Sequence, residues 1–523
     1  MKRSLRNRTG LALFVLLTLA AAAWAAGTGN DWSGRKAKYV FMFIGDGLGL
    51  QQVNAAEVFN GSVNRTGGEP AIKKLALSGL PVQGMITTYS TNSFITDSAP
   101  AATSLASGYK TDNGVIGMDP AKKQKFTTVA QMVRAKGMKV GVLSSVSLNH
   151  ATPASFYASV PSRNDYYGIG EQLIDSGFDY FAGGGIHQST GKEKDRKDLY
   201  EVAKEKGYQV LRTREEILAA KPGTKVIAVN PVLDGSNAMP YDMDRTPEQL
   251  SLAEFTRKGI ELLDNPNGFF MMVEGGKIDW ACHANDAAAT ILDTFAFDAA
   301  VMEALSFAEK HPDETLIVVV GDHETGGMSI GFAGTQYETF FEKIAHQKES
   351  YESFDKKIAA FRKGEEKTFE KMAPMIADSF GLRTATAEER AALEEKAKAG
   401  EFIEADEEQV VREIRTLVEE IDCRTVLMSD SATNLLDVQG RLPEDRKNML
   451  AEIERYLSLD ARGKLEFSLR SRISSFYGQY GGLTADIYRE VGPYLRQEGL
   501  DFTRASDDDL RRGIVVIREK LMP

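Results

Sequence analysis

Short apolar runs rich in β-branched residues recur along the first part of the chain, and they predict strands buried on both faces. Such runs contain almost no polar residue, which is typical of a parallel sheet covered by helices on both sides. The clearest runs are residues 39–44, 140–143, 225–229, 269–273 and 316–320. We therefore expect five neighbouring strands of one large sheet.

Stretches with helical spacing separate these runs. Residues 246–263 open with Thr-Pro-Glu and continue as an amphipathic segment, and residues 285–310 follow the same period. Alternation of this kind predicts an α/β fold, with a large, mostly parallel central sheet and helices on both faces. We expect this core to span residues 35–346. Residues 347–523 are rich in charge and helical in pattern, so we interpret them as a helical insertion or cap that could return to the core near the C-terminus.

The N-terminus has the pattern of a secretory signal peptide over residues 1–25. Four basic residues precede an apolar run over residues 11–23, and Ala23-Trp24-Ala25 matches a small-residue cleavage site. The apolar run is shorter than the roughly 20 residues that a membrane-spanning helix needs. The pattern therefore predicts an exported protein, periplasmic or extracellular, with no stable membrane insertion.

Charge and cysteine content narrow the classes of function further. The chain has 63 basic and 74 acidic residues, a net charge of -11, which disfavours binding to nucleic acid. A phosphate-binding role would therefore depend on a local positive site, such as metal ions or a single arginine. The cysteines are Cys282 and Cys423. They form no disulfide framework, and a single bridge between them is left open.

Acidic and histidine residues follow four of the predicted strands. In an open α/β sheet, ligands bind outside the carboxyl ends of the strands, so these residues are expected to meet at one edge. Any one of them alone could be a turn residue or a structural histidine. Their coincidence at four strand ends predicts a functional site built from Asp46, His150, Thr152, Glu274, Asp279, His283, Asp322 and His323.

The types of these residues point to metal ions. Asp279 and His283 are four positions apart, so on a helix they would face the same way and could hold one cation. Mixed carboxylate and imidazole ligands suit Zn²⁺. Sites that offer only oxygen, as Asp46, Thr152 and Glu274 would, suit Mg²⁺ better.

The stretch "ITDSAPAATSLASG" places Ser98 directly after an acid and before a small-residue helix. One interpretation is a helix start, with Asp or Ser as the N-cap and Pro100 in the first turn. The other is that Ser98 stands at the positive end of that helix, where it could meet an anion such as phosphate.

Five motifs in order resemble the alkaline phosphatase family. They are "FIGDGLG", "TDSAPAATSLASG", "HATPASFYASVPSR", "VEGGKIDWACHAND" and "VVGDHETGG", and they cover roughly residues 38–329. The resemblance implies hydrolysis of small phosphate monoesters through a phosphoserine intermediate at Ser98, with two Zn²⁺ ions and one Mg²⁺ ion. It also allows a homodimer.

The resemblance assigns a role to each candidate residue. Ser98 would be the nucleophile, and Arg163 would grip two phosphate oxygens, a task that suits its planar fork. Asp279 and His283 would hold the first zinc. The second zinc and the magnesium would share a bridging Asp46, with Asp322 and His323 completing that zinc and Thr152 and Glu274 holding the magnesium.

Three positions depart from the family pattern. His150 stands where some members have Asp, which changes the third metal site. Trp280 stands where some members have Lys. The family also supplies a late zinc histidine in a His-Thr-Gly motif, whereas no histidine follows His346 here, so the first zinc would keep only Asp279 and His283.

Neighbouring functions remain as alternatives. Sulfatases share this fold but carry an arginine two residues after the proline of their nucleophile motif, where this chain has Ala102. A phosphodiesterase of the same superfamily is the nearest alternative, and Arg163 favours the doubly charged monoester over it. The third alternative is an inactive, secreted relative that binds metal or phosphate without turnover.

Overall fold

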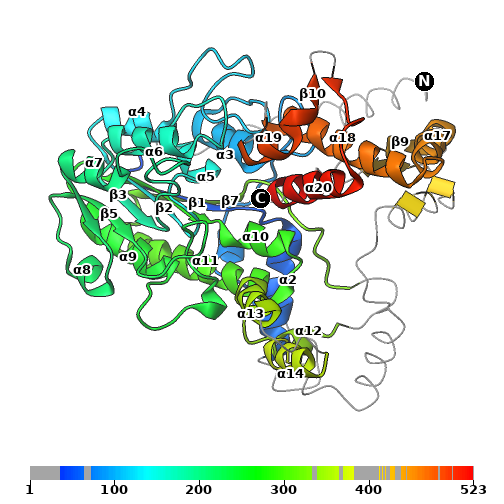
Figure 1. The fold of residues 1–523 in the computed structure, drawn as a ribbon. Coiled ribbons are helices and arrows are strands. Elements are labelled where there is room, and N and C mark those ends of the chain that lie inside the picture. The colour runs from blue at the N-terminus through cyan, green and yellow to red at the C-terminus, as the bar shows by residue number, and fades with distance from the viewer. Residues whose placement is uncertain are drawn as a thin grey trace, which may run out of the picture.

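A seven-stranded sheet forms the centre of the computed structural model, which describes residues 36–63, 72–331, 339–363, 369–381 and shorter stretches between 411 and 521. All its strands are parallel, in the order β4-β5-β3-β2-β6-β1-β7 (Figure 1). The strands are β1 (Tyr39–Gly45), β2 (Lys139–Ser144), β3 (Tyr180–Gly183), β4 (Tyr208–Leu211), β5 (Lys225–Val229), β6 (Phe269–Gly275) and β7 (Thr315–Gly321). The α/β fold class predicted from the apolar runs is confirmed.

All five predicted strands are present, and two further strands escaped prediction. β3 and β4 have only four residues each, so their apolar runs are too short to stand out from the loops around them. β4 is the edge strand of the sheet, and β3 lies between β5 and β2.

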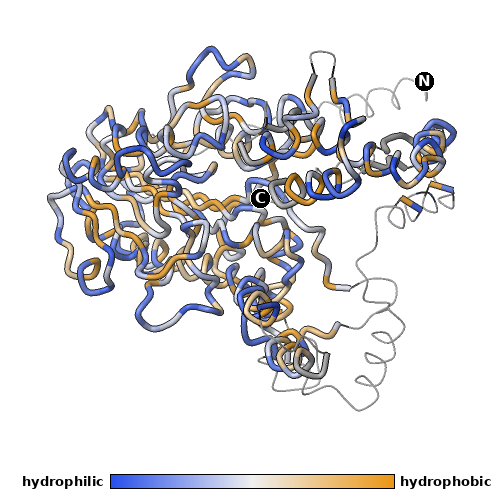
Figure 2. The backbone as a smooth tube through the Cα atoms, viewed as in Figure 1, coloured by the Kyte–Doolittle hydropathy of each residue, from blue (hydrophilic) through white to orange (hydrophobic). Residues whose placement is uncertain are grey.

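The strand side chains alternate between two apolar cores, one on each face of the sheet. In β1, Phe41 and Phe43 belong to one buried cluster, whereas Ile44 belongs to the other. Figure 2 shows the central strands as the most hydrophobic part of the backbone. The central strands are covered on both faces, so their polar groups can reach solvent only at the strand ends. The prediction of burial on both faces is wrong for the edge strand β7, where Leu316 and Val318 are 47% and 39% exposed.

Helices cover both faces of the sheet (Figure 1). On one face lie α3 (Ser98–Ser107), α4 (Val129–Ala135), α5 (Ala151–Ala154), α6 (Tyr166–Asp175) and α7 (Leu199–Glu205), and on the other α9 (Leu252–Leu263) and α11 (Ala287–Ala308). α2 (Leu50–Val63), α8 (Arg214–Ala219) and α10 (Lys277–His283) complete the core.

Two predicted helices are present with shifted bounds. The segment expected from residue 246 becomes helical only at Leu252, because Ser251 and Glu254 form a capping box there. The segment expected from residue 285 begins at Ala287, where the Asp286 side chain caps the Ala289 amide.

The region after residue 346 is mainly helical in its described parts. It contains α13 (Tyr351–Lys363), α14 (Phe369–Ser379), α17 (Arg446–Leu457), α18 (Ala461–Tyr480), α19 (Ala485–Val491) and α20 (Asp507–Leu521), after the short α12 (Phe341–Ile344). Two small antiparallel pairs, β8 (Thr425–Ser429) with β9 (Val438–Leu442) and β10 (Leu495–Arg496) with β11 (Gly499–Leu500), were not predicted.

The C-terminal helices have apolar clusters of their own. One cluster joins α18, α19 and α20, and another centres on α17, and the buried members of both come only from residues 411–517. The expected return of the chain to the core remains a prediction. The predicted signal peptide, Cys423 and residues 382–410 lie outside the described residues. In the described part of the chain, no helix is both long and apolar enough to cross a membrane.

Candidate active site at the carboxyl edge of the sheet

The register of the central strands brings the predicted acids together. Gly45 at the end of β1 pairs with Gly275 of β6 and with Gly321 of β7, so the residues that follow these strands emerge side by side. Asp46 and Asp322 both come directly after the paired glycines, and the Gly47 amide donates a hydrogen bond to Asp322 Oδ1 at 3.1 Å. The regular parallel ladder therefore sets the spacing of the two carboxylates.

Gly47 is required by the turn that follows β1. Its φ angle is +65°, in the left-handed region, and a Cβ atom there would lie 2.7 Å from Asp279 Oδ1. Glycine thus allows the chain to turn sharply and lets the backbone approach the second pair of candidate ligands.

Asp46 is the centre of the site. Two groups of side chains have ligand atoms that all lie within 4.8 Å of one another: Asp46 with His150 and Glu274, and Asp46 with Asp322 and His323. Asp46 and Glu274 are completely buried. Thr152 Oγ1 donates to Asp46 Oδ2 at 3.3 Å, so this predicted residue joins the first group.

Buried oxygen atoms without partners fit bound cations. Asp322 Oδ2 and Glu274 Oε1 are buried and accept no hydrogen bond, although buried polar atoms are normally paired. Burial, with repulsion from neighbouring carboxylates, raises the pKa of Asp46 well above its usual range and that of Glu274 to about 7. A cation would neutralise this repulsion and supply the missing partners, so the donor set suits divalent metal ions.

The raised pKa values predict that the metal-free protein loses stability as the pH rises above about 6.5. The pKa values of Glu274 and His323 are raised in the folded protein, so these side chains still hold protons there. The unfolded chain has already released those protons at the same pH. Below that pH, His150 opposes the trend, because burial lowers its pKa to about 3. We expect the free energy of unfolding to fall by up to about 1 kcal/mol between pH 6.5 and 8.5 in chelator.

Thermal denaturation at several pH values measures this effect. With metal ions added, the acids have a permanent counter-charge, and the decline should disappear. A metal-free protein whose melting temperature is constant or rises from pH 6.5 to 8.5 would contradict the prediction.

Ser98 lies at the start of α3, beside the acid cluster. Its side chain is 4% exposed, and its Oγ donates to Asp46 Oδ1 at 3.2 Å and contacts His323 Nε2 at 3.3 Å. α3 has ten residues, and its free N-terminal amides and dipole favour an anion at this end. Both interpretations of the serine-rich stretch are therefore compatible: it begins a helix, and the serine faces the cluster.

Arg163 is anchored beside Ser98. One guanidinium nitrogen, Nη1, donates to Asp97 Oδ2 at 2.7 Å, and the other, Nη2, lies 3.1 Å from His150 Nε2. Asp97 also accepts from the Gly114 amide at 2.9 Å. The arginine is 8% exposed, so burial and these contacts hold its guanidinium group in one position.

Asp279 and His283 form a pair next to the cluster. They lie together on α10, the condition under which their spacing lets them face the same way, with His283 Nε2 3.4 Å from Asp279 Oδ1. Burial by itself would raise the pKa of Asp279, but the hydrogen bond and charge of His283 lower it. Thr325 connects the pair to the cluster: its hydroxyl donates to Asp279 Oδ1 at 2.6 Å and lies 3.2 Å from His323 Nδ1.

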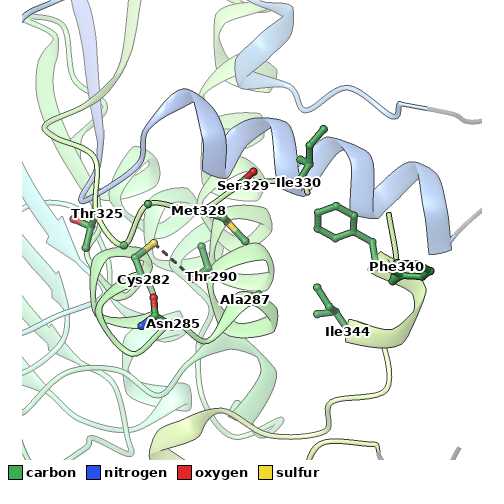
Figure 3. Close-up of a pocket in the computed structure, with 13 residues that line it drawn as sticks. Cys282, Asn285, Ala287, Thr290, Thr325, Met328, Ser329, Ile330, Phe340 and Ile344 are labelled. Carbon is green, nitrogen blue, oxygen red and sulfur yellow. Dashed lines mark hydrogen bonds between the residues drawn. The ribbon is translucent and has the colours of Figure 1, made fainter. Parts of the chain in front are cut away.

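Two cavities flank the site. The one beside α10 has a volume of about 450 Å³ and a mainly apolar lining that includes Met328, Ile330 and Ile344 (Figure 3). Cys282 lies in its wall as a free, buried cysteine. Burial raises the pKa of its thiol to about 11, so it stays protonated. The second cavity lies beyond His150.

The structure thus gathers the predicted residues at one edge, and it adds three that sequence reasoning missed. These are Asp97, which binds Arg163, Thr325, and Ser144, whose hydroxyl donates to Glu274. For Asp97, its position directly before Ser98 was the one sequence feature that pointed to a role in the site. Ser144 and Thr325 are ordinary polar residues in the sequence, and their roles follow only from strand register and the turn after β7.

Known proteins resemble the chain in sequence and fold. The alkaline phosphatase family model matches residues 37–406. Alkaline phosphatase 3 of Bacillus subtilis is 31% identical, with the match covering 76% of this chain and 85% of the relative. Streptomycin-6-phosphate phosphatase of Streptomyces griseus is 31% identical over 60% of this chain and 79% of the relative. The crystal structure of a cold-active alkaline phosphatase from Shewanella sp. has a TM-score of 0.56 and 31% identity, covering 66% of this chain and 80% of the other.

The fold, the acid-rich edge and these likenesses define the class: the protein is a hydrolase of α/β architecture. More narrowly, the chain belongs to the alkaline phosphatase family, and it is a phosphatase.

Proposed function

We propose that this phosphatase hydrolyses phosphate monoesters, with Ser98 as the nucleophile. The observation that carries the proposal is the placement of the Ser98 hydroxyl, within 3.3 Å of both Asp46 and His323 at the start of α3. A serine hydroxyl is a weak nucleophile until a neighbouring base or cation helps it to ionise. The cluster around Asp46 can supply this help, and the helix start favours the phosphate anion.

Metal ions would occupy two parts of the cluster and the neighbouring pair. We assign one Zn²⁺ to Asp46, Asp322 and His323, a second to Asp279 and His283, and one Mg²⁺ to the oxygen donors of Asp46, Thr152 and Glu274, with His150 beside it. When bound, these ions would lower the pKa of the serine hydroxyl and neutralise charge on the ester oxygens.

The residues of the chain then divide the reaction between them. Ser98 Oγ loses its proton and bonds to phosphorus, while the bond from phosphorus to the ester oxygen breaks and the alcohol leaves with a proton. A water molecule then attacks the phosphoserine, which frees Ser98 and releases inorganic phosphate. Arg163, held by Asp97 and His150, would stabilise two of the phosphate oxygens as charge develops on them.

The positive charge of Arg163 favours a phosphate monoester over a diester as the substrate. Arg163 offers a forked donor, which suits a phosphate with two negative charges. The relative named for streptomycin-6-phosphate supports a small phosphate ester as substrate. The predicted export, the metal identities and the homodimer belong to this proposal.

Hydrolysis of an aryl phosphate monoester tests the proposal. With Zn²⁺ and Mg²⁺ supplied at alkaline pH, we expect turnover that disappears in chelator and returns when the ions are restored. The matching bis-aryl diester, assayed in parallel, should be hydrolysed at least about a hundredfold more slowly. A folded, metal-loaded protein that binds phosphate without turnover would contradict the proposal, and faster cleavage of the diester would favour a phosphodiesterase.

A further inference from the structure

The cavity beyond His150 has the size and the chemistry of a site for the alcohol part of a substrate. We propose that it selects phosphate monoesters of small, positively charged alcohols, an inference that rests on the proposed monoesterase activity. The cavity has a volume of about 500 Å³, which is within the range of small-molecule sites. Its lining includes His150, Tyr166, Asp234, Trp280, Glu352 and Asp355.

His150 connects the cavity to the catalytic cluster. Its ring forms part of the cavity wall, while its Nε2 atom lies 3.1 Å from Arg163 Nη2. Trp280, the residue after Asp279, lies in the same wall, and its ring centroid is 5.8 Å from the ring centroid of His150. A phosphate held by Arg163 would therefore have the cavity as its neighbour, and the alcohol that it esterifies could extend past His150 into it.

Aromatic rings form one part of the cavity wall. Tyr166 packs edge-on against His187, with centroids 4.7 Å apart, and both line the cavity together with Trp280 and Tyr351. Aromatic faces attract methylene groups and cations. The aromatic rings would thus accept an alkylammonium group as well as an apolar group. Which of the two the cavity prefers depends on the charge of its other residues.

The charge of the cavity favours a cation. Lys277, completely buried, binds Asp234 Oδ2 and Glu352 Oε2 at 2.9 Å each, and Lys356 binds Glu352 Oε1 at 3.0 Å. Asp355, an exposed lining residue, makes no ion pair with any described residue. Three carboxylates thus face two ammonium groups, and one negative charge is left at the mouth. The other cavity, beside Cys282, has no charged residue in its lining.

The negative charge of the cavity would discriminate between substrates that have the same shape but differ in charge. An ammonium group in the cavity would lie near Asp355, in a partly enclosed space where the attraction is screened less than in open water. A neutral alcohol of the same shape would gain the aromatic contacts alone.

A pair of isosteric esters provides the test. Choline phosphate and 3,3-dimethylbutyl phosphate have the same shape, but the first carries a quaternary nitrogen where the second has carbon. With the metal-loaded enzyme, and release of inorganic phosphate as the readout, we expect kcat/KM to be at least about tenfold higher for choline phosphate. Asp355→Asn should reduce that ratio about two- to fivefold.

Glu309→Gln is the matched control. It removes the same unit of charge just after the end of α11, at the opposite edge of the sheet from the site, and it should leave the ratio of the wild-type enzyme unchanged. A wild-type ratio near one, with both esters hydrolysed, would overturn the inference while leaving the monoesterase proposal intact. A ratio that does not change in Asp355→Asn would also overturn it. If neither ester nor an aryl phosphate is hydrolysed, the monoesterase proposal fails and the inference fails with it.

Discussion

Replacing Ser98 by alanine is expected to reduce turnover of phosphate monoesters by at least about a thousandfold. The side chain that would form the covalent intermediate is then absent, while the acids, the histidines and Arg163 remain in place. Binding of inorganic phosphate should persist, because the helix start and Arg163 do not depend on the hydroxyl. Steady-state kinetics and phosphate titration together separate loss of chemistry from loss of binding.

Ser104→Ala provides the control in the same helix. The Ser104 hydroxyl donates to the Pro100 carbonyl at 2.8 Å within α3 and contacts none of the site residues. We expect near wild-type turnover from this variant. If Ser98→Ala retained a substantial fraction of wild-type kcat, a water molecule and not the serine would be the nucleophile, and the proposed phosphoserine would be wrong.

Replacing Asp46 by asparagine is expected to remove bound metal as well as activity. Asp46 is the residue shared by the two groups of potential ligands, and it accepts hydrogen bonds from both Ser98 and Thr152. One neutral amide would therefore weaken two cation sites at once. We expect the metal content of the purified protein to fall by about one to two ions per chain, and kcat to fall at least about a thousandfold.

Asp293→Asn tests whether the effect is specific to the site. Asp293 is also a buried acid whose pKa burial raises well above its usual range, but it lies on α11 and belongs to neither group of ligands. Its asparagine variant should keep its metal content and its activity. Elemental analysis that finds wild-type metal in Asp46→Asn would show that the cluster holds its cations by other atoms.

The central strands and the candidate ligands were predictable for the same reason. Strands β1 and β7 are continuously apolar until they end, so Gly45-Asp46 and Gly321-Asp322 were visible as sharp changes from apolar to acidic residues. β3 was too short to give that contrast. The spacing of Asp279 and His283 predicted that they would face the same way on a helix, because four residues make about one turn, and α10 is that helix.

The contacts that position the site were not predictable from spacing. Asp97 and Arg163 meet across 66 residues of sequence, and no periodicity links a helix cap to a loop arginine. The same is true of Lys277, whose partners Asp234 and Glu352 come from two separate segments. Resemblance to a family supplied a role for Arg163, but neither its partners nor the charged cavity beside it.

The parallel ladder of the sheet also has a practical consequence. Because every strand points the same way, the candidate ligands and Ser98 gather at one edge, and the turns before β2, β6 and β7, at residues 136–138, 264–268 and 309–314, hold none of them. A reporter domain fused into one of those turns, or a solid support attached there, would leave the opposite edge open to solution. The orientation of the strands thus marks where this chain can be tethered.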